Sequence, residues 1–167
     1  MDNIKRIYLC EMTPAKMQMF FKEFAYDPDV FSDTTQCKNY VYDEQKADDY
    51  YRKQSQQGRI HYAVMLGEKV IGDVYLKRID HKKKCCTFAI HLVNDSVKNK
   101  GYGTRAEELM LTYVFEELQL ETVFADCLIK NERSQHVLTK VGFMEINRDN
   151  EYVYYKCQRS MWRKAGI

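Results

Sequence analysis

The sequence contains only two prolines and seven glycines among 167 residues, and it has no linker, repeat or low-complexity stretch. Nothing therefore marks an internal boundary, and we expect residues 1–167 to form a single domain. A chain of this length can close one sizeable core. Hydrophobic and charged contents of 45% and 30% are ordinary for a soluble globular protein.

No run of apolar residues is long enough to span a bilayer, and residues 1–6 lack the apolar segment of a secretory signal. We therefore expect a cytoplasmic protein without a membrane partner. The net charge of +2 lacks the strong basic excess of a nucleic-acid binder, so we expect no nucleic-acid partner. We interpret the lysine run at 82–84 as a solvated turn, because a charge run alone is weak support for nucleic-acid contact.

The cysteines form no Cys-x-x-Cys pair, which argues against a zinc site, and we expect no metal. In a cytoplasmic chain we expect free thiols, most of which pack as small buried hydrophobes. The six cysteines are Cys10, Cys37, Cys85, Cys86, Cys127 and Cys157.

The spacing of apolar residues predicts the element order β-α-α-β-β-β-α-β-α-β-β. Thr13 and Pro14 open the first helix, as its cap and its first residue. The third helix follows Gly103-Thr104. We predict strands at 7–10, 60–66, 70–79, 85–93, 122–127, 143–148 and 152–161, and further helices at 43–57 and 134–141. The fold class is therefore α+β, with a mixed central β-sheet and helices on both faces.

The polar loop 98–104, Lys-Asn-Lys-Gly-Tyr-Gly-Thr, stands between a predicted strand and a predicted helix. A helix start offers unpaired N–H groups and a partial positive charge, and glycines let phosphate oxygens approach the backbone. Lys98 and Lys100 add positive charge. A lone Gly-x-Gly is common in ordinary turns. Here it fits neither a dinucleotide fingerprint, because Ala106 replaces the third glycine, nor a Walker loop.

This loop resembles the acetyl-CoA signature of the GNAT superfamily of N-acetyltransferases, Arg/Gln-x-x-Gly-x-Gly/Ala, with Lys98 in the first place. A second block at 131–143 resembles the superfamily's motif Asn-x-x-Ser-x-x-Val/Leu-x-x-Lys-x-Gly-Phe. The two motifs follow in the superfamily's order, and the resemblance covers residues 60–148. The Asn-x-x-Ser form is similar to the branch that acetylates the N-termini of ribosomal proteins.

The resemblance implies a GNAT acyl-CoA N-acyltransferase fold and acetyl transfer from acetyl-CoA to a primary amine by direct attack in a ternary complex. The acceptor is then a protein N-terminus or a small-molecule amine, and homodimerisation is left open. Acetyl-CoA is the implied co-substrate, and no metal is required. The alternative is a non-catalytic acyl-CoA-binding or regulatory module, because the binding loop is complete while no base is obvious.

By the same resemblance, acetyl-CoA contacts fall on two segments, and N–H groups near Leu92 and Val93 stabilise the oxyanion. Asn131 either binds the pantetheine arm or caps the following helix. The implied cofactor-binding residues are Leu92, Val93, Lys98, Asn99, Lys100, Gly101, Tyr102, Gly103, Thr104 and Asn131.

Other branches of the superfamily protonate the leaving thiolate with a tyrosine that lies four residues after the motif's serine. That place is Leu138 here, so the resemblance makes Ser134 the candidate acid. The alternative interpretation is that Ser134 only caps its helix.

The general base is less apparent, since Thr87 and Phe88 stand where related enzymes often carry a glutamate. His91 is the best local candidate, because histidine side chains titrate near neutral pH. An ordinary strand histidine is the alternative. Asp73 is a weaker candidate base, and a water relay is a third option.

Five aromatic residues are candidates for the wall of an acceptor pocket, although most aromatics simply pack in cores. They are Phe31, Tyr40, Tyr42, Tyr152 and Tyr154.

Overall fold

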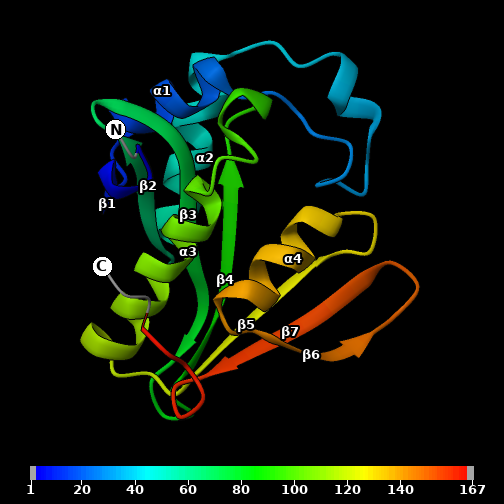
Figure 1. Ribbon diagram of the computed structural model, residues 1–167. Coiled ribbons are helices and arrows are strands. Elements are labelled where there is room, and N and C mark those ends of the chain that lie inside the picture. Colours follow the sequence, from blue (N-terminus) through cyan, green and yellow to red (C-terminus); the bar gives the residue numbers. More distant parts are fainter. Residues whose placement is uncertain (1–2, 165–167) are drawn as a thin grey trace.

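The computed structural model describes residues 3–164 and contains one seven-stranded sheet with the order β1-β2-β3-β4-β5-β7-β6 (Figure 1). Neighbouring strands are antiparallel except β4 and β5, which are parallel, so the sheet is mixed as predicted. The strands are β1 (Ile7–Glu11), β2 (Ile60–Leu66), β3 (Lys69–Asp80), β4 (Cys85–Leu92), β5 (Thr122–Leu128), β6 (Met144–Arg148) and β7 (Tyr152–Gln158).

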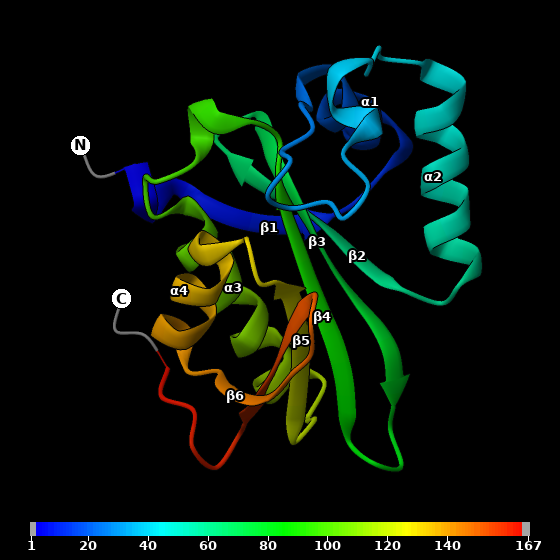
Figure 2. The same cartoon turned by 90° about the vertical axis from the view of Figure 1, so that its right-hand side faces the viewer.

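Helices cover both faces of the sheet, which confirms the predicted architecture (Figure 2). Along β2, Ala63 and Met65 pack in the cluster that contains Met17 of α1, whereas Val64 packs in the cluster with Met110 of α3. None of the helices within residues 3–164 is long and apolar enough to cross a membrane. The helices are α1 (Pro14–Glu23), α2 (Glu44–Gln56), α3 (Tyr102–Thr112), which continues as a π-helical turn (Tyr113–Glu117), and α4 (Glu132–Val141).

Local capping chemistry sets the starts of α1 and α2 where the sequence predicts them, whereas α3 begins at Tyr102 and already includes Gly103 and Thr104, which the sequence prediction places before it. The hydroxyl of Thr13 accepts a hydrogen bond from the N–H of Lys16, and Pro14 is the first residue of α1. The carboxylate of Asp43 caps α2. The fourth helix differs, since it begins at Glu132, two residues earlier than predicted. The last strand also stops at Gln158, where a turn follows.

The sheet opens between β4 and β5. These strands pair only from Cys85 to Thr87 with Thr122 to Phe124, although β4 continues to Leu92 and β5 to Leu128. The divergence is visible in Figure 1, where α3 and α4 flank it. Beyond the paired residues, the separation leaves backbone groups of both strands facing the space between them. The candidate site lies in this space.

The six cysteines are free thiols, and half of them lie in the core, where they behave as small hydrophobes. Cys86, Cys127 and Cys157 are buried, whereas the other three are half-buried. The lysines at 82–84 lie in an exposed turn between β3 and β4, as the sequence indicates.

Candidate active site

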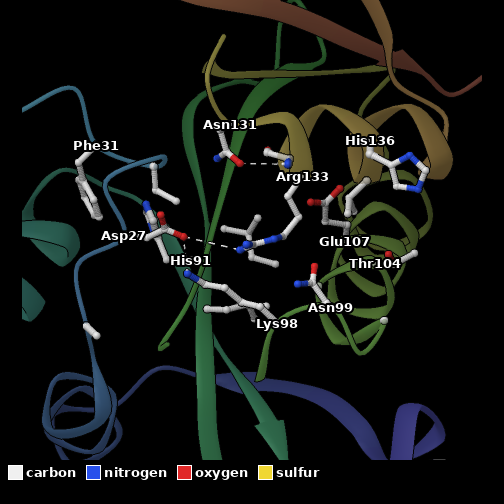
Figure 3. Close-up of a pocket in the computed structure, with 18 of the residues that line it drawn as sticks. Asp27, Phe31, His91, Lys98, Asn99, Thr104, Glu107, Asn131, Arg133 and His136 are labelled. Atoms are coloured by element: carbon white, nitrogen blue, oxygen red, sulfur yellow. Dashed lines mark hydrogen bonds and ion pairs between the residues drawn. The ribbon is translucent and has the colours of Figure 1, made fainter. Parts of the chain in front are cut away.

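Two adjoining cavities occupy the opening between β4 and β5. The first is bordered by the loop that starts α3, by the first turns of α4 and by residues of 24–31 (Figure 3). The second lies against the inner parts of β3, β4 and β5. The cavities share several lining side chains, among them Phe31, His91, Glu107, Asn131 and Ser134. These shared residues mark the junction at which two ligands would meet.

The start of α3 is open to the first cavity. Gly101 is the N-cap with φ of 78°, a left-handed conformation that favours glycine, and no side chain caps the helix. The N–H of Arg105 donates to the carbonyl of Gly101 at 3.0 Å, so the three preceding N–H groups have no intrahelical acceptor. Gly101, Gly103 and Thr104 line the cavity. This helix end therefore has the features of an anion site.

The two loop lysines occupy different environments. Lys98 is buried, and its Nζ lies 2.6 Å from Asp27 Oδ2 and 3.2 Å from Asp95 Oδ1. Burial would raise the pKa of Asp27, but the hydrogen bond and charge of Lys98, with help from Arg133, lower it. Asp27 thus stays ionised and offsets much of the charge of Lys98. Lys100 is exposed and lines neither cavity.

The end of β4 presents one free backbone edge to the opening. The N–H of Val93 donates to the carbonyl of Ile71 in β3 at 3.0 Å. Since N–H groups alternate in direction along an antiparallel pair, the N–H of Leu92 points away from β3. Leu92 and Asn99 line the first cavity, whereas the side chain of Tyr102 is buried in the core.

The structure shows which of Asn131 and Ser134 caps α4. The Oδ1 of Asn131 accepts a hydrogen bond from the N–H of Ser134 at 3.1 Å, so Asn131 is the cap of α4. The interpretation of Ser134 as the cap is therefore wrong. Burial raises the pKa of the Cys127 thiol to about 11, despite a hydrogen bond with Ser134 that lowers it. Leu138 is buried and apolar, so it cannot supply a proton.

His91 is held from behind by a buried carboxylate. Its Nδ1 lies 3.2 Å from Asp73 Oδ1, and Nε2 of His61 lies 2.8 Å from Asp73 Oδ2. Burial would raise the pKa of Asp73, but the hydrogen bonds and charges of both histidines outweigh it and lower the pKa. Asp73 is 1% exposed and lines neither cavity, so it can act on a ligand only through His91.

With its Nδ1 facing Asp73, His91 keeps Nε2 for the cavities. A quarter of its side chain, 25%, is exposed, and the ring lies nearly parallel to that of Phe31 at 6.2 Å. The histidine is thus a half-buried group at the junction of the two cavities.

Glu107 is a site residue that sequence reasoning missed. It is 3% exposed, lines both cavities, and its Oε2 has no hydrogen-bond partner within residues 3–164. Burial first, and then the charge of Glu108, raise the pKa of Glu107 well above its ordinary value. The available signal was its position one turn before the buried Leu111, on the apolar side of the helix.

Two of the five candidate aromatics line the second cavity, namely Phe31 and Tyr152. Tyr40 donates a hydrogen bond from its hydroxyl to the carbonyl of Phe21, and Tyr154 donates to Asp149. Tyr42 hydrogen-bonds Gln18, and these three tyrosines line neither cavity.

The part of the chain that the structure describes holds no cluster of three or more histidine, cysteine, aspartate or glutamate side chains suited to a metal ion. Besides His91 and Glu107, the charged or ionisable side chains that line the cavities include Asp27, Lys77, Lys98, Asp126, Arg133 and His136.

Comparison with known proteins gives a consistent result. A family model described as the acetyltransferase (GNAT) domain matches residues 6–144. YjcK of Bacillus subtilis (strain 168), named as a probable N-acetyltransferase, is 29% identical over 113 residues, which cover 59% of this chain and 62% of that protein. The match thus spans less than two thirds of YjcK. YdaF of the same organism, named as a candidate ribosomal N-acetyltransferase, is 26% identical over 132 residues, covering 73% and 72% of the two chains.

Solved structures share the fold at low sequence identity. A spermidine N-acetyltransferase from Vibrio cholerae in complex with CoA and spermine has a TM-score of 0.77 at 16% identity, covering 94% of this chain and 98% of that chain. AAC(6′)-Ib in complex with ribostamycin and coenzyme A also has a TM-score of 0.77 at 16% identity, covering 93% and 94%. The sheet that opens between β4 and β5 is therefore the fold of N-acetyltransferases.

Proposed function

The chain belongs to the acetyltransferase (GNAT) domain family, and on that premise we propose that it transfers the acetyl group of acetyl-CoA to a primary amine. One observation carries the proposal. An uncapped helix start and a carboxylate-held histidine face the same pair of adjoining cavities. The helix start suits a phosphate-bearing donor, and the histidine suits deprotonation of an amine.

The first cavity is assigned to acetyl-CoA. We assign its pyrophosphate to the start of α3, where no side chain caps the helix and the first N–H groups have no intrahelical acceptor. We assign the pantetheine arm to the edge of β4, where the N–H of Leu92 points away from β3, and to the space beside Asn131, whose Oδ1 caps α4 and whose Nδ2 is a hydrogen-bond donor. The thioester then reaches the junction of the two cavities.

Amine attack requires a neutral nitrogen, whereas an α-amino group has a pKa of about 8 and a lysine amine about 10.4. His91 is proposed to accept the amine proton on Nε2, with the Asp73 carboxylate stabilising the imidazolium. The N–H of Leu92 is proposed to stabilise the oxyanion. Ser134 is proposed to donate a hydrogen bond to the leaving thiolate, because Leu138 cannot.

The acceptor is proposed to enter through the second cavity, past Phe31 and Tyr152. Spermine and ribostamycin in the two structurally similar enzymes support a small-molecule amine. The Asn-x-x-Ser motif at Asn131 and the similarity to YdaF support a protein N-terminus, as in the ribosomal branch. Both classes remain within the proposal.

The competing function is a non-catalytic acyl-CoA-binding module. Calorimetry with acetyl-CoA, followed by turnover with spermine, ribostamycin and peptides bearing free N-termini, separates the two. Acetylation of one amine class, abolished in His91→Gln without loss of acetyl-CoA binding, supports the enzyme. Binding without turnover of any amine supports the module.

A further inference from the structure

Glu107 is an unusual group for its location. Its carboxyl is on the buried side of α3, only 3% exposed, and Oε2 has no hydrogen-bond partner within the described residues. A buried polar atom without a partner lowers the stability of the folded state. A protein tolerates this most readily where a ligand supplies the missing partner, and Glu107 lines both cavities.

The position of Glu107 relates it to the rest of the site. It lies four residues after Gly103, so the two residues lie on the same face of α3, about 6 Å apart along the helix axis. Figure 3 shows the carboxyl group projecting from α3 into the cavity. It lines the second cavity together with Ser134 and Leu138, the two positions at which the resemblance to the superfamily predicts a proton donor.

The charges around Glu107 do not neutralise it. Arg133 and Lys98 contact Asp27 instead. The other ionisable side chains that line the two cavities are Tyr75, Lys77, His91, Asp126, Cys127, His136 and Tyr152, and Glu108 adds a like charge on α3. None of these hydrogen-bonds Oε2 of Glu107 in the part of the chain that the structure describes.

Resting on the proposed acetyl transfer, we propose that Glu107 is the proton donor to the departing CoA thiolate. Ser134 then orients the sulfur, and Glu107 supplies the proton. Burial, followed by the charge of Glu108, raises the pKa of Glu107, so a protonated carboxyl is present when the thiolate forms. A thiol titrates near 8.5, so the departing sulfur can take a proton from a carboxyl group whose pKa is raised.

The proton balance of the step closes. The amine nitrogen forms a bond to the acetyl carbon and loses one proton to Nε2 of His91. The carbon–sulfur bond breaks, and the thiolate takes the proton of Glu107 to become the CoA thiol. His91 then releases its proton to water and Glu107 takes one back, which restores both groups without an external reagent.

The test compares kcat against pH for the wild type, Glu107→Gln, Glu108→Gln and Ser134→Ala, with acetyl-CoA and whichever panel amine the wild type acetylates. Glutamine keeps the shape of Glu107 but has no proton to give. We expect Glu107→Gln to lower kcat about 100-fold, to remove the fall in rate at high pH, and to leave the acetyl-CoA Kd within about threefold.

Glu108 is the matched control, since it lies next to Glu107 on α3 and faces Arg105 at 3.6 Å instead of a cavity. Glu108→Gln should keep the wild-type kcat on the plateau and retain a high-pH limb, moved to lower pH because the charge of Glu108 no longer raises the pKa of Glu107. Ser134→Ala should lower kcat but keep that limb.

The infrared difference spectrum of wild type minus Glu107→Gln at neutral pH gives a readout without turnover. A protonated carboxyl band supports the proposal, and a carboxylate band overturns it. Should Glu107→Gln fold poorly, Glu107→Met serves as the apolar second variant.

A Glu107→Gln profile that retains the wild-type limb and rate overturns the donor role, as does a change confined to the acetyl-CoA Kd. A wild type that acetylates amines while Glu107 proves dispensable refutes only this inference. A wild type that neither binds acetyl-CoA nor acetylates any amine refutes the proposed function and the inference together.

Discussion

The replacement Asp73→Asn tests the proposal that Asp73 supports His91 as the general base. The carboxylate lies 3.2 Å from His91 Nδ1, and full attraction at that distance is about 5 kcal/mol with an effective dielectric constant of about 20. His91 keeps 25% of its side chain exposed, so solvent screening reduces this to about 2–3 kcal/mol. The replacement should therefore lower kcat/KM about 30- to 150-fold.

The pH profile separates this electrostatic role from a structural one. Without the carboxylate, the imidazolium that forms during amine deprotonation loses its counter-charge, so the rate should fall across the whole profile of kcat/KM against pH. The assay is the initial rate of CoA release across pH with saturating acetyl-CoA.

His61→Gln is the control, because His61 contacts the other oxygen of Asp73 and lines neither cavity. That variant should lose stability but keep the limb and most of the rate. An Asp73→Asn profile that overlays the wild type would refute the reasoning and leave a water relay as the source of the base.

Three further predictions follow from the same geometry. Gly103→Asp should weaken acetyl-CoA binding about 1,000-fold in calorimetry, since a carboxylate about 4 Å from a phosphate costs about 4 kcal/mol. Gly103→Ala is the control and should bind normally, because its Cβ would lie 3.6 Å from Leu92, an ordinary contact distance. Equal affinities of the two variants would contradict the pyrophosphate assignment. Ser134→Ala should lower kcat more than it changes the acetyl-CoA Kd, and a loss of stability alone would remove Ser134 from the chemistry. Glu107→Gln should be more stable than the wild type at neutral pH, because the pKa of Glu107 is raised in the folded state. Wild-type stability that is present below about pH 4.5 is then lost by about 1.4 kcal/mol per pH unit until the folded-state pKa is reached. In urea denaturation, the difference in unfolding free energy between the two proteins should be larger at about pH 7 than at about pH 5, and a constant difference would contradict the prediction.

Local patterns carry much of the fold and part of the site. The cap at Thr13, the alternating residues of the strands and the glycine loop at Gly101 all act over a few residues, so the sequence alone places them correctly. The order of two motifs likewise identifies the family before any geometry is known.

Contacts between distant segments lie beyond such patterns. Lys98 meets Asp27 across 71 residues, so its charge could not be assigned from the loop alone. The sequence names Asp73 only as a weaker candidate base, whereas the pairing of β3 with β4 sets its buried carboxylate beside His91. Glu107 lines a cavity because β4 and β5 separate beyond their short paired segment. That separation depends on the arrangement of the whole sheet, which local sequence patterns do not give.

The most direct test of acetyl transfer at these cavities is an initial-rate study that varies acetyl-CoA and the amine together, with mass spectrometry of both product and protein. We predict intersecting double-reciprocal lines, an amine heavier by one acetyl group, and a protein of unchanged mass, as direct attack in a ternary complex requires. Parallel lines with an acetylated protein, or tight binding of acetyl-CoA with every amine unchanged, would contradict the account.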